Sequence, residues 1–200
     1  MRKTNMAQYT RNILKVFAQC TGDEVQHGLN WYSDAKQNAQ DIADKYQLPL
    51  HVVIGVIAAL SPTNSWEMNI RNADTMCHIF VDGGYVEDTK PSTYKTMRDK
   101  AWSILQTMPH NIDDVAFILN GPKITDFAYC IMGNDVCVID GHAWCIANAD
   151  RRTMQEVPNI GKKLRAELQQ AYSNAGKKHN MTAYEMQAAT WVAWKRIHNV

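Results

Sequence analysis

Apolar residues recur three and four positions apart along most of the chain, which is the repeat of one face of an α-helix. The stretch 30–46 shows this repeat over several turns, and Leu48-Pro49-Leu50 ends it. The next stretch, 52–60, is apolar on nearly every side, which predicts a helix buried in a core. Further helices are predicted, among them those over 66–81, 112–119, 125–132, 142–149, 162–174 and 182–197. With about nine helices and short connections, the pattern indicates an all-α fold.

Length and composition favour one folded domain with at most two lobes. The chain has 200 residues, of which 46% are hydrophobic and 20% charged, and a chain of this size buries about 70% of its unfolded surface. Its longest apolar run is far below the roughly 18 residues of a membrane span. Met1–Asn5 leads into no apolar signal segment, so we expect no export and no membrane partner.

The cysteines and histidines give no sign of a metal site. The five cysteines are scattered without a C-x-x-C pair, and the histidines show no ligand spacing. We therefore expect reduced thiols, no metal and no other cofactor. Reduced thiols are typical of a cytoplasmic protein, here of a bacterial or phage-infected cell.

The net charge of +1 conceals an uneven distribution. Residues 1–150 carry 12 Lys and Arg against 17 Asp and Glu, whereas residues 151–200 carry 9 against 3. A basic C-terminal segment is typical of a surface that binds nucleic acid. It is also typical of a solvated helix face balanced by an acidic remainder, and the charge taken alone favours this second interpretation.

The motif with the most chemical content is a glycine turn followed by an aspartate. Asn120-Gly121-Pro122-Lys123 joins two predicted helices, and such a turn points backbone N–H groups outward, where they can hold a phosphate. Asp140 follows on a loop just before the helix predicted from His142. Its carboxylate could act on a nucleotide held beside the turn, or it could cap that helix.

Four sequence blocks in this order resemble the helix-hairpin-helix DNA glycosylase superfamily, which includes endonuclease III and the adenine glycosylases. The blocks are Val56–Asn64, similar to the family's helix ending in LSAQT; Asp99–Leu105, similar to its KA..I helix; Asn120–Ala128, similar to its hairpin; and Val138–Trp144, similar to its VDTHV segment. A second resemblance, through Gly28–Tyr32, residues 59–69 and Gln187–Trp191, is to a family of small phage-type proteins and supplies no activity.

The glycosylase resemblance assigns roles to individual residues. It makes Asp140 the catalytic carboxylate and His142 a structural support of its loop. It also implies that Ser61, Thr63 and Asn64 belong to the loop that fills the gap left by a flipped base. We expect these three side chains to contact DNA.

In the hairpin block, Gly121, Lys123 and Thr125 match DNA-binding positions, and Lys123 lies near the family's catalytic lysine. When Thr125 is aligned with the family's threonine, however, Ile124 takes the place of that lysine. Pro122 also removes one N–H donor from the turn, and the family's iron–sulfur loop with four cysteines is absent. The poor match at the lysine favours a monofunctional enzyme in which the aspartate acts without a lysine nucleophile. This mismatch and Pro122 also favour an enzyme that modifies a flipped base, or a non-catalytic relative.

Two further features could contact DNA. The string Val157–Leu164 resembles a second, generic DNA-binding hairpin, in which Lys162 and Lys163 supply positive charge; a glycine turn before a solvated helix is the alternative. Trp66 directly follows the loop at 61–64 and could stack on a base, although a core position is the commoner place for a single tryptophan.

The predicted architecture is the two-lobed helical fold of the helix-hairpin-helix glycosylases. One lobe would span 50–130, with its hairpin near 119–128, and the other would combine 1–49 with 136–200. The leading hypothesis is a DNA glycosylase-like enzyme that flips a base out of double-stranded DNA and cleaves its N-glycosidic bond. Two alternatives stay open: an enzyme that modifies a flipped pyrimidine, as in thymine hypermodification, and a non-catalytic relative that binds DNA or a host protein.

Overall fold

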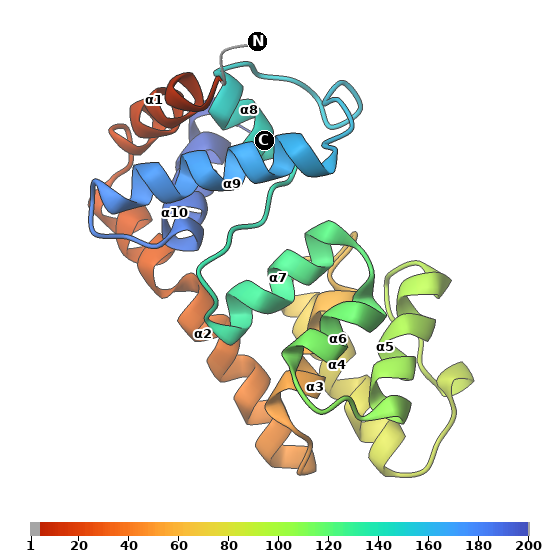
Figure 1. Ribbon diagram of the computed structural model, residues 1–200. Coiled ribbons are helices and arrows are strands. Elements are labelled where there is room, and N and C mark those ends of the chain that lie inside the picture. Colours follow the sequence, from red (N-terminus) through yellow and green to blue (C-terminus); the bar gives the residue numbers. More distant parts are fainter. Residues whose placement is uncertain (1–4, 200) are drawn as a thin grey trace. The chain divides into compact units, whose positions relative to one another are not determined.

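The computed structural model describes residues 5–199 and is built of helices (Figure 1). Within that range it contains ten α-helices, one short 3₁₀ helix and no strand. The prediction of an all-α chain is confirmed. The chain divides into two compact units, which we describe separately. Unit 1 holds the described residues up to Ser33 and from Asn134 onward, and unit 2 holds Asp34–Gly133.

Unit 2 is arranged around one apolar helix. It contains the second part of α2 (Gly22–Tyr46), α3 (Leu50–Leu60), α4 (Trp66–Val81), η1 (Val86–Asp88), α5 (Lys95–Thr107), α6 (Ile112–Leu119) and α7 (Pro122–Met132). Helices α4, α5, α6 and α7 all pack against α3. Every residue from Val52 to Leu60 is buried, as the apolar pattern predicts. Gly55 permits the close packing, because a Cβ there would lie 2.5 Å from the side chain of Val115 on α6.

Unit 1 has its own core. It contains α1 (Met6–Phe17), the first part of α2, α8 (Gly141–Asn148), α9 (Lys162–Lys177) and α10 (Ala183–His198). Helix α1 packs against α8, α9 and α10 (Figure 1). Ile13, Ile146 and Tyr172 are completely enclosed where these helices meet. The irregular chain before α8 contributes Cys137 and Ile139 to the same core.

Two helices begin at least three residues earlier than the apolar repeat predicts. Helix α2 starts at Gly22 rather than near Asn30, because Thr21 and Glu24 cap its first turn. The Thr21 N–H donates to the Glu24 carboxylate at 2.8 Å, and the Glu24 N–H donates to the Thr21 hydroxyl at 3.2 Å. Helix α7 starts at Pro122 rather than near Thr125, because a proline in the first helical position loses no hydrogen bond.

We expect Gly28→Ala to lower the free energy of unfolding by about 1–3 kcal/mol. A Cβ at this position of α2 would lie 2.6 Å from the backbone nitrogen of Ala189 on α10, so the two helices would have to move apart. Gly22→Ala is the matched control, since nothing lies within 4 Å of a Cβ there. Urea unfolding measures both variants, and equal stabilities would contradict the close approach.

An ion pair also joins α2 to α10 in unit 1. The buried carboxylate of Glu24 accepts a hydrogen bond from the guanidinium of Arg196 at 2.7 Å. This bond, helped by the backbone and hydroxyl of Thr21, holds the pKa of Glu24 below its ordinary value. The ionised carboxylate therefore stabilises the folded state.

We expect Glu24→Gln to reduce the acid sensitivity of the fold. Because the folded-state pKa is depressed, the stabilisation is present above the ordinary glutamate pKa of 4.5 and is lost as the pH falls through the folded-state value. At pH 7 the variant should be less stable by about 1–2 kcal/mol, since the arginine is partly exposed. It should then lose less stability than the wild type between about pH 5 and pH 3.

Denaturant unfolding at a series of pH values measures this difference. Glu67→Gln is the control, because it makes the same chemical change at an exposed position of α4. Parallel pH profiles for Glu24→Gln and the wild type would refute the assigned role of the ion pair.

All five cysteines are free thiols, and four of them are buried. Burial raises the pKa of the Cys20 thiol to about 11 and that of Cys77 to about 12. Burial also raises the pKa of Cys145. These thiols are consequently protonated and poorly nucleophilic at neutral pH.

Candidate functional site

Asp140 caps the first turn of α8 in unit 1. Its Oδ1 accepts a hydrogen bond from the backbone N–H of Ala143 at 2.8 Å, and its backbone carbonyl accepts one from Trp144 at 3.0 Å. Among the described residues, no hydrogen-bond donor or cation is paired with the second carboxylate oxygen, Oδ2. The half-buried carboxylate is therefore held in one orientation, with one oxygen occupied and the other available.

Tyr172 of α9 supports the backbone next to Asp140. Its side chain is completely buried, and its hydroxyl donates to the carbonyl of Ala143 at 3.3 Å. Burial, with a smaller contribution from nearby acidic groups that include Asp140, holds the pKa of Tyr172 well above its ordinary value. The phenol stays protonated and keeps donating to α8 at any pH near neutral.

His142 packs rather than pairs with Asp140. Its ring stands edge-on to Trp191 of α10, with the ring centroids 6.3 Å apart. Lys195 also lies against Trp191, with its ammonium 4.4 Å from the indole centroid. These contacts tie the first turn of α8 to α10, which is compatible with the supporting role expected of His142.

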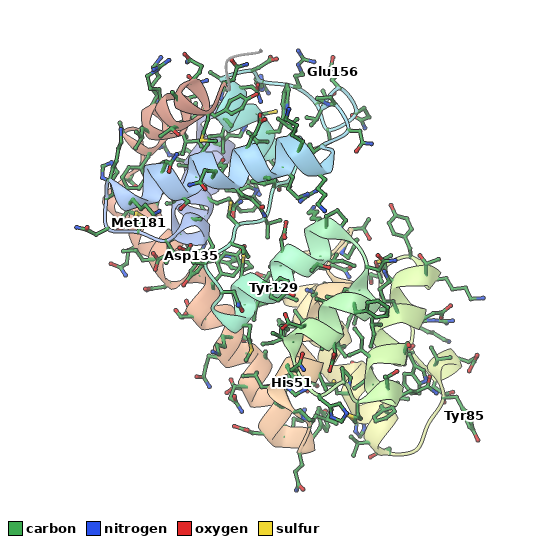
Figure 2. All side chains as sticks on the ribbon, in the orientation of Figure 1. His51, Tyr85, Tyr129, Asp135, Glu156 and Met181 are labelled. Carbon is green, nitrogen blue, oxygen red and sulfur yellow. The ribbon has the colours of Figure 1, made fainter. Side chains whose placement is uncertain are left out.

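The segment 151–161 folds back over the start of α8. A Cβ at Gly141 would lie 2.6 Å from the sulfur of Met154, so a larger residue there would displace this flexible side chain. Glu156, labelled in Figure 2, braces the segment, because its carboxylate accepts hydrogen bonds from the N–H and the hydroxyl of Thr153 at 2.9 and 2.8 Å. The residue after Asp140 is thus covered by this loop.

The string 157–164 forms a loop followed by a helix. Residues 157–161 contain no helix, and a turn at 154–156 comes before them, so the two-helix hairpin that the string resembles is not formed. Helix α9 begins at Lys162 with no side-chain cap and no acidic residue in its first turn. Lys162 and Lys163 are exposed there. Both the uncapped N–H groups and the two ammonium groups favour an anion at this helix end.

The first predicted hairpin lies at a short connection between two helices. In unit 2, α6 and α7 are joined by only two residues, Asn120 and Gly121, and Asn120 adopts a left-handed conformation with φ of 43°. Lys123 and Thr125 lie in the first turn of α7 rather than in the connection. Lys123 is exposed, whereas Thr125 is half-buried.

The polar side chains at 61–64 cap the end of α3. The Ser61 hydroxyl donates to the carbonyl of Ala58 at 2.9 Å, and the Asn64 amide donates to that of Leu60 at 2.8 Å. These bonds satisfy carbonyls that a helix end leaves without a partner. Ser61 and Asn64 thus have structural roles that could account for their presence without DNA.

Thr63 occupies the tip of the same loop. Its φ of 68° is in the left-handed region, which a β-branched residue rarely adopts. The loop is held from the other side, because the Thr93 hydroxyl donates to the carbonyl of Pro62 at 2.8 Å. Strain of this kind concentrates at functional positions.

Trp66 begins α4 immediately after this loop. Its half-buried ring meets Phe127 of α7 edge to face, with centroids 6.4 Å apart. Through this contact unit 2 brings the loop at 61–64 together with the helix that carries Lys123 and Thr125. The remaining predicted site residues, Asp140, His142, Lys162 and Lys163, belong to unit 1.

The comparison with known families covers nearly the entire chain, since one family profile matches residues 1–198. The chain belongs to DUF7178, a family of unknown function. No curated protein and no solved structure matches it. The membership supplies no activity, so any function for this DUF7178 chain has to be argued from its own residues.

Sequence reasoning missed one residue of this DUF7178 chain as a functional candidate. Gln187 of α10 is buried, with 6% of its surface exposed, and lies between Tyr184 and Trp191 on one face of the helix. The signal in the sequence was a long polar residue at a position where the helical repeat predicts an apolar one. The sequence does not show, however, whether a polar side chain at that position has a hydrogen-bond partner.

Two general findings concern membrane-spanning helices and metal sites in the described residues. Over residues 5–199, no single helix is long and apolar enough to cross a membrane. The same residues contain no group of three or more His, Cys, Asp or Glu side chains that could hold a metal ion.

Proposed function

We propose that this chain is a DNA glycosylase-like enzyme in which Asp140 acts on a base taken out of the DNA stack. The observation that carries the proposal is the carboxylate geometry. One oxygen is fixed by the Ala143 N–H and the other has no partner among the described residues. A carboxylate prepared in this way can stabilise positive charge at the sugar carbon, or accept a proton from an attacking water, as the N-glycosidic bond breaks.

Charge supports binding of DNA by unit 1. Residues 1–33 and 134–200 contain 13 Lys and Arg against 8 Asp and Glu, a net charge of +5. The uncapped start of α9, with Lys162 and Lys163, belongs to the same unit as Asp140. A phosphate bound at that helix end would therefore lie on the unit that carries the carboxylate.

A non-catalytic relative is the second candidate, and the chemistry of unit 2 favours it. Residues 34–133 carry 8 Lys and Arg against 12 Asp and Glu, a net charge of −4. On α6, next to the hairpin, Phe117 is 86% exposed and follows the exposed Asp113 and Asp114 by about one turn. An acidic face with a prominent aromatic ring repels DNA phosphates and is better suited to a protein surface.

Mass spectrometry of intact oligonucleotides separates the candidates. The protein is incubated with duplexes that carry uracil, hydroxymethyluracil, oxidised purines or mismatches. Loss of the mass of a base by wild type, but not by Asp140→Asn, is the result we expect. A gain in mass that requires an added donor would replace base removal by base modification, and unchanged masses with DNA still bound would favour the non-catalytic relative.

A further inference from the structure

Gln187 differs from the other buried polar residues of the described chain. Seven polar or charged residues are buried, and six of them have a side-chain hydrogen bond: Thr10, Asn12, Glu24, Asn69, Thr89 and Thr190. The amide of Gln187 has none among residues 5–199. Buried amides are almost always paired, so this one requires an explanation.

The amide lies among aromatic rings and still reaches solvent. The two fully enclosed, unpaired polar atoms of the described chain belong to Asn69 and Asn72, so the Gln187 amide keeps some contact with water. Tyr184 lies three residues before it and Trp191 four residues after it on α10, and both rings are half-buried. Residues at this spacing share one face of a helix.

Other parts of unit 1 hold the two rings in place. Tyr184 meets Tyr32 of α2 edge-on, at a centroid distance of 5.2 Å. Trp191 meets His142 of α8 edge-on, at 6.3 Å. Because His142 follows Asp140 by two residues, the face of α10 that carries Gln187 is attached to the turn that Asp140 caps.

These groups match the chemistry of a nucleobase. A primary amide both donates and accepts, and the edge of a base presents donors and acceptors side by side. Tyrosine and tryptophan rings provide surfaces on which bases stack. A phosphate would call for cationic donors rather than a neutral amide, and an apolar ligand would leave the amide unpaired.

We infer that Gln187, flanked by Tyr184 and Trp191, binds the hydrogen-bonding edge of a nucleobase and so determines which base Asp140 acts on. The second half of this inference rests on the proposed glycosylase activity, whereas the binding of a base does not. In the complex the base edge would supply the hydrogen-bond partner that no described residue provides. Stacking on the Tyr184 and Trp191 rings would hold the edge of the base toward the Gln187 amide.

Nuclear magnetic resonance tests the binding directly. The full-length protein is labelled with ¹⁵N, and the side-chain NH₂ signals of Gln187 are identified by their absence from the spectrum of Gln187→Met. The five 2′-deoxynucleosides of adenine, guanine, cytosine, thymine and uracil are then titrated in turn to millimolar concentration. We expect at least one of them to shift the Gln187 NH₂ signals and the indole N–H signal of Trp191.

Variants make the test quantitative. Gln187→Met keeps the length of the side chain and removes the amide, so affinity for that nucleoside should fall about tenfold or more. Gln170→Met, the same change at an exposed position of α9, should leave affinity unchanged. Circular dichroism melting confirms that both variants fold. Should Gln187→Met fail to fold, Gln187→Glu, which keeps an acceptor but not the donor, should alter the preference among bases.

The possible failures are distinguishable. The inference is overturned if no deoxynucleoside shifts the Gln187 signals, or if a folded Gln187 variant binds every nucleoside as the wild type does. Asp140→Asn should bind nucleosides like the wild type, because the carboxylate acts on the bond and not on the base edge. Normal nucleoside binding without base release from any duplex would therefore overturn the glycosylase activity and leave the nucleobase site standing.

Discussion

Asp140→Asn should reduce base release by about 10²–10⁴-fold while leaving the fold intact. Asparagine keeps the side-chain oxygen that accepts from the Ala143 N–H, and it is as good a helix cap as aspartate. It removes only the negative charge and the basicity of Oδ2. Single-turnover release of a base from the preferred duplex measures the loss of activity. Thermal melting should show almost no loss of stability.

Asp140→Ala separates the two roles of this residue. It removes the cap as well as the carboxylate, so it should cost about 1 kcal/mol of stability in addition to the loss of activity. Asp135, labelled in Figure 2, is the matched control in the same unit. Its carboxylate accepts a hydrogen bond from the Ala183 N–H at 2.9 Å. Asp135→Asn should keep full activity. An Asp140→Asn enzyme with wild-type turnover would refute the catalytic assignment.

Reversing the charge of Lys162 and Lys163 should have the second largest effect. If each contacts one phosphate, their loss lowers the steepness of the salt dependence, the slope of log K against log salt, by about 1.8. Affinity for any duplex should then fall by about 10²-fold at 50 mM salt, and less at higher salt. Fluorescence anisotropy with a labelled duplex measures both quantities.

The control for this change lies at the other end of the same helix. Lys177 and Lys178 are also exposed, so Lys177→Glu/Lys178→Glu changes the net charge equally without touching the uncapped N-terminus. We expect this pair to weaken DNA binding far less. Equal losses for both pairs would mean that DNA responds to total charge and not to the start of α9.

The helical class and the central buried helix could be predicted from the sequence because they follow from apolar spacing alone. Starts of helices were predicted less well where polar residues open them. Helix α2 begins at Gly22 because Thr21 and Glu24 cap it, and Glu24 also pairs with Arg196, which lies far away in the sequence. The ion pair between Glu24 and Arg196 cannot be predicted from the residues next to either of them.

The candidate site shows a similar division. An Asp-Gly pair before a helix predicts either a catalytic carboxylate or a helix cap at Asp140, and the structure shows that the cap exists. Nothing in the sequence shows that Ser61 and Asn64 terminate α3, or that the segment before Gly161 is not helical. Gln187 could not be recognised either, because its missing partner becomes apparent only when its surroundings are packed.

The shielded thiols have a practical consequence for measuring how the chain opens. Cys77 lies in the core of unit 2 and Cys145 in that of unit 1, and a maleimide reaches neither until its own surroundings unfold. The rate at which each thiol is alkylated under native conditions therefore reports local unfolding around that cysteine. Mass spectrometry of the labelled peptides would measure the two alkylation rates separately, so the opening of each unit can be followed at native cysteines without any substitution.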